Sequence, residues 1–162
     1  MRLFLAILPS PAVRASLEAA QDALRQQGRG TFPPPEALHL TLAFLGETED
    51  LSGATAALAA VRARPFSLSV GGPPGRFNDL WWAGVTADRA LEDLALSLQS
   101  DLRARGFYLE DRPFRPHITL VRRWQGDISG VTVPHAKMVV RRVSLLRSAL
   151  QGERRVYTEL AY

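Results

Sequence analysis

The sequence contains no cysteine, and this absence removes several kinds of chemistry at once. Disulfide bonds, thiol nucleophiles and thiolate metal sites are excluded, and a chain without cysteine fits a reducing compartment. Long apolar runs are also missing. The N-terminal run at residues 3–8 stops at Pro9, short of the apolar stretch of a signal peptide and far short of a membrane span. We therefore interpret residues 3–8 as a buried strand and expect a cytoplasmic protein with no membrane partner.

The chain is basic but contains almost no lysine. Of its 20 basic residues only Lys137 is a lysine, and the formal net charge is +4. Arginine binds phosphate groups in a bidentate manner and stacks on bases, so this balance favours a phosphate or nucleic-acid partner. The charge is modest and spread along the chain, however, and biased base composition in the genome explains it equally well. Composition alone therefore does not establish the partner.

A chain of 162 residues with 46% hydrophobic content is long enough for one well-buried domain and short for two. No linker or low-complexity segment interrupts it, so we predict a single domain over residues 1–162. Apolar residues that recur every three to four positions predict helices at residues 11–27, 51–64 and 90–105. Apolar runs predict strands at residues 3–8, 66–70, 80–85, near 131–133, 138–146 and 156–162.

Two further strands are predicted, and they share a four-residue signature: His39-Leu40-Thr41-Leu42 and His117-Ile118-Thr119-Leu120. Successive side chains of a strand point to opposite faces, so each His shares a face with the Thr two residues later. The aliphatic residues then point into a core. A single His-x-Thr would be weak support, as short motifs are. Because two of the 3 histidines carry it, the duplicated signature indicates a functional site.

The surroundings of the two signatures repeat as well. A helix-ending glycine, Gly28 or Gly106, precedes each signature His by 11 residues, and an aromatic residue, Phe4 or Trp82, precedes it by 35. Self-similarity at fixed spacing indicates duplicated architecture. We predict an α+β fold: a single bilobal domain with pseudo-twofold duplicated strand–helix–strand units and mostly antiparallel sheets around a central cleft.

Facing imidazoles would support in-line phosphoryl transfer. Imidazole titrates near neutral pH, so one neutral His can take a proton while a second, protonated His donates one. The hydroxyls of Thr41 and Thr119, with an arginine, would hold the non-bridging oxygens where charge develops. Such a site needs no metal ion and no cofactor. The third histidine, His135, lacks the Thr and is assigned to a surface turn, and the three histidines match no common zinc spacing.

Two arginines follow the second signature. Strand alternation places Arg123 on the face of His117 and Arg122 on the other face, if the strand stays regular that far. By the same alternation, Phe44 shares a face with Leu40 and Leu42 and is assigned to the core. Phe77 and the Trp81-Trp82 pair are candidates for stacking on bases, although core packing is the stronger expectation for the tryptophans.

The signatures and their flanks are similar to those of a known family. The chain resembles the two-histidine (2H) phosphoesterase superfamily, and specifically the RNA 2′,3′-cyclic phosphodiesterases, also called 2′-5′ RNA ligases. The similarity extends over nearly the whole chain and is most specific at residues 112–120. The segments that carry it are residues 2–6, 38–46, 82–85, 112–120 and 144–148.

The resemblance implies metal-independent hydrolysis of a 2′,3′-cyclic phosphate to a 2′-phosphate, with a weak reverse reaction that joins RNA ends through a 2′-5′ linkage. It implies that His39 is the proton donor, His117 the proton acceptor, and that Thr41 and Thr119 contact phosphate. The family's usual spacing favours Arg122 as a further phosphate ligand, whereas strand alternation favours Arg123. The partners would be RNA ends bearing the cyclic phosphate, or cyclic nucleotides, and we expect a monomer.

Two other functions remain open. A relative within the enzyme class would act on 2′-5′ oligonucleotides or on an ADP-ribose cyclic phosphate. A non-catalytic RNA-end-binding module would use the His-Thr pairs only to hold a terminal phosphate. Binding alone does not need two separately titrating groups, and a bell-shaped pH–rate profile would distinguish catalysis from binding.

Overall fold

The computed structural model describes all 162 residues and has an α+β fold with three α-helices and ten strands. The helices are α1 (Pro11–Arg25), α2 (Leu51–Ala59) and α3 (Arg89–Ala104), and a short 3₁₀ helix, η1 (Pro35–Ala37), precedes the first signature. The strands are β1 (Arg2–Ile7), β2 (Gly28–Thr31), β3 (Leu40–Glu47), β4 (Phe66–Gly72), β5 (Gly75–Phe77), β6 (Leu80–Ala87), β7 (His117–Gly126), β8 (Val133–Val140), β9 (Ser144–Gln151) and β10 (Arg154–Ala161).

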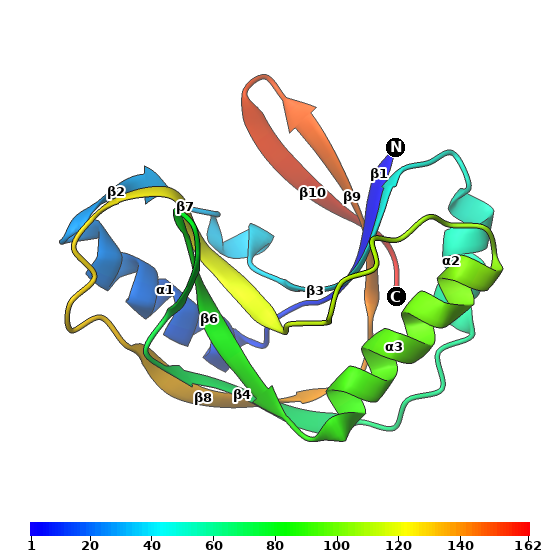
Figure 1. The fold of residues 1–162 in the computed structure, drawn as a ribbon, viewed down its shortest axis with the longest axis horizontal. Helices are drawn as coiled ribbons and strands as arrows, with labels where there is room; N and C mark the ends of the chain where they lie inside the picture. The colour runs from blue at the N-terminus through cyan, green and yellow to red at the C-terminus, as the bar shows by residue number, and fades with distance from the viewer.

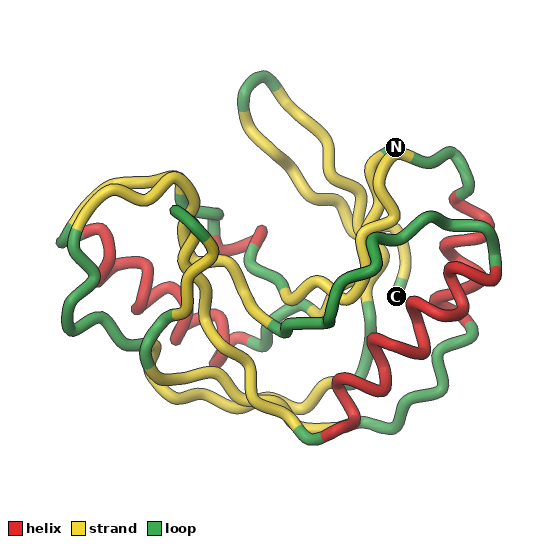
Figure 2. The backbone as a smooth tube through the Cα atoms, viewed as in Figure 1, coloured by secondary structure: helices red, strands yellow, loops and turns green.

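The strands form one large antiparallel sheet that brings the two signatures together. Its order is β10-β9-β1-β3-β7-β6-β4-β8, with β2 beside β7 and β5 beside β6. The signature strands β3 and β7 are neighbours at the middle, where Leu40 pairs with Ile118. We call β10, β9, β1 and β3 the first half, and the remaining strands the second half. Figures 1 and 2 show the strands curving through the middle of the molecule with the helices on either side.

Each long helix crosses to the opposite half. Helix α1 follows β1 but packs against β7 and β8, and α3 follows β6 but packs against β3 and α2 (Figure 1). One hydrophobic core of 34 buried residues joins both halves: it includes Leu17 of α1, Leu98 of α3, and Leu40 and Ile118 of the signature strands. The signature strands β3 and β7 are therefore supported from both halves of the molecule. None of the three helices combines the length and apolar character needed to span a membrane.

Helix α1 follows closely from its sequence. The hydroxyl of Ser10 accepts a hydrogen bond from the Val13 amide at 3.2 Å, and Pro11 occupies the first turn, as expected for a capped helix. The buried stripe predicted for the helix is also present, because Val13, Leu17, Ala20 and Leu24 are all buried. The helix ends at Arg25, two residues before the predicted boundary.

The two glycines with matched spacing have different roles. Gly106 ends α3 with a φ of +95°, a conformation that favours glycine. Gly28 instead begins β2, where a Cβ atom would lie 2.4 Å from the Gln125 carbonyl oxygen and 2.7 Å from the Trp124 ring. Gly28 is therefore needed for the close approach of β2 to β7, and the prediction that it only ends a helix was incomplete.

Three other predicted elements differ from the structure. The strand expected at residues 138–146 is two strands, because β8 ends at Val140 beside β4, whereas β9 begins at Ser144 beside β1 in the other half. Helix α2 ends at Ala59, short of the predicted residue 64. His135 is exposed, as predicted, but lies in strand β8 and not in a turn.

Candidate active site

The two signature histidines have the same backbone anchor. The carbonyl oxygen of Ala37 lies 2.7 Å from Nδ1 of His39, and that of Arg115 lies 2.6 Å from Nδ1 of His117. A carbonyl oxygen can only accept a hydrogen bond, so Nδ1 of each ring carries the hydrogen and donates it. The second ring nitrogen, Nε2, is then left for proton transfer in both histidines.

Each histidine ring also lies against two aromatic rings. For His39 these are Phe4, with centroids 4.8 Å apart, and Tyr157, which is perpendicular at 5.3 Å. For His117 they are Trp82 at 6.0 Å and Phe77, perpendicular at 5.2 Å. Phe4 and Trp82 are the aromatic residues with the matched 35-residue spacing, so the sequence repeat corresponds to a repeated contact. These rings restrict the orientation of each imidazole.

The register across the central strands pairs each histidine with the other signature's threonine. Leu40 lies opposite Ile118 in an antiparallel pair. The residues that flank this pair therefore face each other: His39 opposite Thr119, and Thr41 opposite His117. These two histidines and two threonines each lie next to Leu40 or Ile118 in sequence. Side chains alternate along a strand, so the four polar side chains share the face opposite to the buried Leu40 and Ile118.

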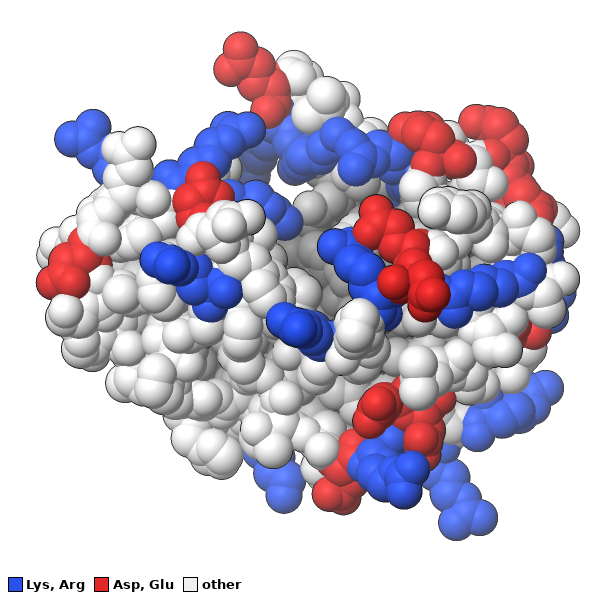
Figure 3. Space-filling view, in the orientation of Figure 1, with Lys and Arg blue, Asp and Glu red and all other residues white.

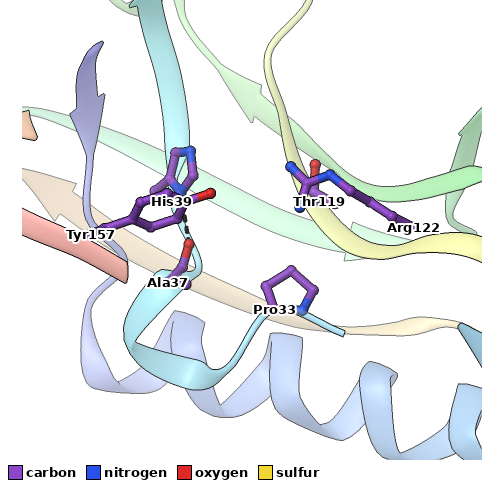
Figure 4. A pocket seen from close by; sticks show the side chains of 6 residues that line it. All are labelled: Pro33, Ala37, His39, Thr119, Arg122 and Tyr157. Atoms are coloured by element: carbon purple, nitrogen blue, oxygen red, sulfur yellow. Dashed lines mark hydrogen bonds between the residues drawn. The ribbon is translucent and has the colours of Figure 1, made fainter. Parts of the chain in front are cut away.

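A small pocket opens on this face beside His39. Figure 4 shows His39 and Tyr157 on one side, with Thr119 and Arg122 opposite them. Its lining residues are Pro33, Ala37, His39, Thr119, Arg122 and Tyr157. The pocket thus joins His39, which directly precedes β3, with residues of β7, η1 and β10. Thr41 and His117 are not among the residues that line it; Thr41 is half-buried in β3 and His117 begins β7.

A β-bulge decides which arginine faces the pocket. On β6, Trp82 pairs with Thr119 and Trp81 with Val121, so Leu120 has no partner. The extra residue reverses the alternation beyond it. Arg122 therefore lies on the face of Thr119, whereas Arg123, which has a φ of +54°, does not line the pocket. The sequence left the choice between these two arginines open, and the bulge is the departure from a regular strand that favours Arg122.

The first signature strand contains the same bulge. Ala6 pairs with Thr41 and Leu5 with Ala43, so Leu42 has no partner on β1. The alternation reverses here too, and Phe44 turns away from the core and is 60% exposed. Its assignment to the core was wrong because that assignment assumed a regular strand. The ring centroid of Phe44 lies 6.0 Å from that of Phe4, the ring beside His39.

The environment of His39 disfavours its protonated form in the unliganded protein. Burial lowers the pKa of His39 below its ordinary value of 6.5, against the opposing effect of the hydrogen bond to Ala37. The positive charge of Arg122, and that of His117 when His117 is protonated, lower this pKa further. An anion bound between these groups would reverse the balance, because a negative charge stabilises the imidazolium. No group of three or more His, Asp or Glu side chains is arranged to hold a metal ion.

Three pocket residues were not predicted from the sequence, Pro33, Ala37 and Tyr157, and Tyr157 is the most distant of them in the chain. It lies 118 positions after His39, in a strand that was predicted only as an apolar run. Two strand pairings bring it to the site, β10 with β9 and β9 with β1. No periodicity or motif in the sequence reports such a contact. In Figure 4 its ring lies beside His39 and its hydroxyl points toward Thr119 and Arg122.

Comparison with known proteins gives consistent matches. The family model described as the 2'-5' RNA ligase superfamily matches residues 9–149. The RNA 2',3'-cyclic phosphodiesterase of Thermus thermophilus is 36% identical to this chain over an alignment of 179 positions, gaps included. The alignment covers 99% of this chain and 88% of that protein. The protein of the same name from Geobacillus stearothermophilus is 37% identical over 134 residues, covering 76% of this chain but 42% of the relative.

A solved structure agrees with these matches. The apo structure of Escherichia coli LigT superposes with a TM-score of 0.82 at 28% identity, over 98% of this chain and 94% of LigT. LigT has also been crystallised in complex with 3'-AMP, and that structure superposes with a TM-score of 0.80 at 30% identity. The family resemblance inferred from the two signatures is confirmed by these comparisons.

Proposed function

Because the chain belongs to the 2'-5' RNA ligase superfamily and its homologues over most of its length are RNA 2',3'-cyclic phosphodiesterases, we propose that it hydrolyses RNA 2′,3′-cyclic phosphate ends to 2′-phosphate ends. His39 and His117 act as general acid and base, without a metal ion. The observation that carries this proposal is the pocket in which His39 of one signature meets Thr119 and Arg122 of the other.

The proposed step is an in-line displacement at phosphorus. Nε2 of neutral His117 accepts a proton from water, and the water oxygen forms a bond to phosphorus. The bond between phosphorus and O3′ breaks, and Nε2 of protonated His39 donates its proton to O3′, so the phosphate remains on O2′. The Nδ1 hydrogen bonds to Ala37 and Arg115 support these roles, because they keep Nε2 of both rings free.

The phosphate itself would be held by hydroxyls and one guanidinium. Thr119 and Arg122 border the pocket, and Thr41 lies on the same face beside His117. Their hydrogen bonds to non-bridging oxygens strengthen as negative charge develops in the transition state. The guanidinium fork of Arg122 fits two phosphate oxygens at once. We assign this role to Arg122 and not to Arg123.

Binding of the substrate would also prepare the acid. The pKa of His39 is lowered by burial, by the positive charge of Arg122 and by that of His117 whenever His117 is protonated, so the free protein holds the ring of His39 mainly neutral at pH 7. The negative phosphodiester placed between His39 and Arg122 offsets those charges and raises the pKa of His39 in the complex. Protonation of the acid is thereby coupled to the presence of the group on which it acts.

The fold supports a single domain built by duplication. The proposed units are β1–α1–β3 and β6–α3–β7, which occupy mirrored places in the strand order and carry the same bulge. The two halves form two lobes with the site at the junction of β3 and β7. One continuous core and a pocket completed within one chain support a one-domain, monomeric enzyme.

Hydrolysis is tested with a short RNA that ends in a 2′,3′-cyclic phosphate. Phosphorus NMR of the product is expected to show the phosphate on O2′, and the rate is expected to be unchanged in EDTA. His39→Ala and His117→Ala are expected to abolish turnover with the fold intact, whereas His135→Ala, at an exposed histidine, serves as the matched control.

Tight binding of this RNA without turnover would instead favour the RNA-end-binding module. Turnover only of 2′-5′ oligonucleotides or of an ADP-ribose cyclic phosphate would favour the alternative substrates.

A further inference from the structure

We propose that the face of hairpin β9–β10 beyond Tyr157 binds the phosphodiester backbone of the RNA upstream of the reacting end, through Arg155 and Arg2. This inference rests on the proposed function, because it extends the same site from the terminal nucleotide to the preceding part of the strand. Its consequence is that the enzyme distinguishes an oligonucleotide end from a cyclic mononucleotide.

The strand register places these residues on the face that contains His39. Tyr157 and Arg155 are two residues apart on β10, so their side chains share a face. Ser148 of β9 lies opposite Tyr157, and Arg2 of β1 lies opposite Ser148. The guanidinium of Arg155 donates a hydrogen bond to the Ser148 hydroxyl at 3.1 Å, which is consistent with this register. Residues that run outward from His39 thus form one continuous polar row.

This face of the first half is not covered by a helix. The opposite face of β1 and β9 belongs to the main core through Leu3, Leu5 and Leu145. The face of the row instead carries a small separate cluster of Phe4, Ala6 and Leu146, against which Tyr157 packs. In Figure 1 the outer part of the hairpin projects beyond the other strands with no helix over it. The row is therefore open to a ligand that continues out of the pocket.

The charge of the row suits a polyanion. Arg2 and Arg155 are both exposed, and neither forms an ion pair within the protein. Of the carboxylates near the row, Glu47 pairs with the N-terminal ammonium at 3.3 Å and Glu159 accepts a hydrogen bond from Ser144. Glu153, in the turn two residues before Arg155, is exposed and forms no ion pair. On the side of the molecule drawn in Figure 3, basic side chains lie around the central hollow, and acidic side chains also lie at its border.

The position of Arg155 separates its role from that of the pocket. Its Cα atom lies about 7 Å beyond that of Tyr157 along the strand, given the rise of an extended chain. A cyclic mononucleotide that fills the pocket carries no further phosphate to reach this distance. An oligonucleotide carries one phosphate for each preceding nucleotide, and each arginine–phosphate contact releases counterions and makes binding depend on salt.

The experiment compares two substrates, a cyclic mononucleotide and a pentaribonucleotide, each ending in a 2′,3′-cyclic phosphate. For the pentamer, Arg155→Ala and Arg2→Ala are each expected to raise KM about threefold to tenfold, and to reduce the slope of log KM against log salt by about 0.7. For the mononucleotide, the same substitutions are expected to change KM less than about twofold, because that substrate has no upstream phosphate.

Arg154→Ala is the matched control. Arg154 is the adjacent residue on β10 and is similarly exposed, but it alternates to the other face and pairs with Glu36 at 3.4 Å. It is expected to leave the salt slope of the pentamer unchanged. Arg155→Lys is expected to retain most of that slope because it keeps the charge, which distinguishes lost charge from a misfolded hairpin.

The outcomes for the two proposals are separate. If the unsubstituted enzyme hydrolyses neither substrate, the proposed function fails. If it hydrolyses both, but Arg155→Ala affects them equally or Arg154→Ala has the same effect as Arg155→Ala, the assignment of this face to the RNA backbone is overturned while the hydrolytic function stands.

Discussion

Phe44 and Arg122 occupy the same position in two matching strands. Each follows its signature histidine by five residues, and each is turned to the signature face by a bulge at the preceding leucine, Leu42 or Leu120. The two halves of the site are therefore equivalent in backbone but unequal in charge. One guanidinium lies beside the pocket, and an exposed aromatic ring takes its place in the other half.

Arg122→Ala is expected to lower kcat about a hundredfold, because it removes a donor to the developing charge on the phosphate. It also removes one of the charges that lower the pKa of His39, so this pKa is expected to rise. The first effect is measured by steady-state kinetics and the second by NMR titration of the ring. Arg123→Ala, which does not touch the pocket, is the control, and a greater loss in that variant would contradict the assignment.

The pH dependence of the reaction follows from the lowered pKa of His39. The acid must be protonated, so kcat/KM is expected to fall as pH rises through a pKa that lies below 6.5 in the free enzyme. The corresponding fall in kcat is expected at higher pH, because the bound phosphodiester favours the imidazolium. Rate profiles from pH 5 to 9 measure both. If kcat/KM fell only at pH values above the ordinary histidine pKa of 6.5, the assignment of His39 as an acid with a lowered pKa would be refuted.

Tyr157 is expected to hold the ring of His39 through its own ring. Tyr157→Phe retains the perpendicular contact, so kcat is expected to stay within about threefold of the parent value. Tyr157→Ala removes that contact and is expected to lower kcat about tenfold or more, with a changed NMR signal for His39 but not for His117. Tyr108→Ala, at a residue that is 86% exposed, is the control. Equal rates for the two Tyr157 variants would argue against a positioning role.

Gly28→Ala is expected to destabilise the fold by about 1–3 kcal/mol, a typical cost of forcing extra atoms into a packed site. The added methyl group would collide with the Gln125 carbonyl and the Trp124 ring. Thermal or urea unfolding measures the loss, and the kinetics of enzyme that remains folded should be little changed. An unaltered unfolding midpoint would mean that β2 can move away from β7 without cost.

Several features of this protein could be predicted because they depend on neighbours in the chain. The apolar stripe and Ser10 cap of α1 were correctly predicted, as was a strand at each signature, although β3 begins at Leu40, one residue after His39. The matched distances of Phe4 and Trp82 from their histidines reported a repeat that the structure shows as a repeated ring contact. The stripe, the cap and the strand alternation depend on residues close together in the chain. The matched spacing was found by comparing one segment of the sequence with another.

The main errors about the sheet have one physical origin. Phe44 was assigned to the wrong face, and the choice between Arg122 and Arg123 stayed open, because a bulge is a property of two paired strands. The partner strands β1 and β6 are separate segments of the sequence from β3 and β7. Residues 138–146 were predicted as one strand because apolar character does not say which edge of a sheet a segment joins.

The amino-acid order alone was sufficient to determine the paired His-Thr units, the two long helices and the family to which the chain belongs. Tertiary pairing decided that His39 meets Thr119, that Arg122 and not Arg123 enters the pocket, and that Tyr157 reaches His39 from the hairpin. Alternation and helical periodicity act over a few residues. Contacts between strands that are about a hundred residues apart depend instead on how the whole sheet closes around its core.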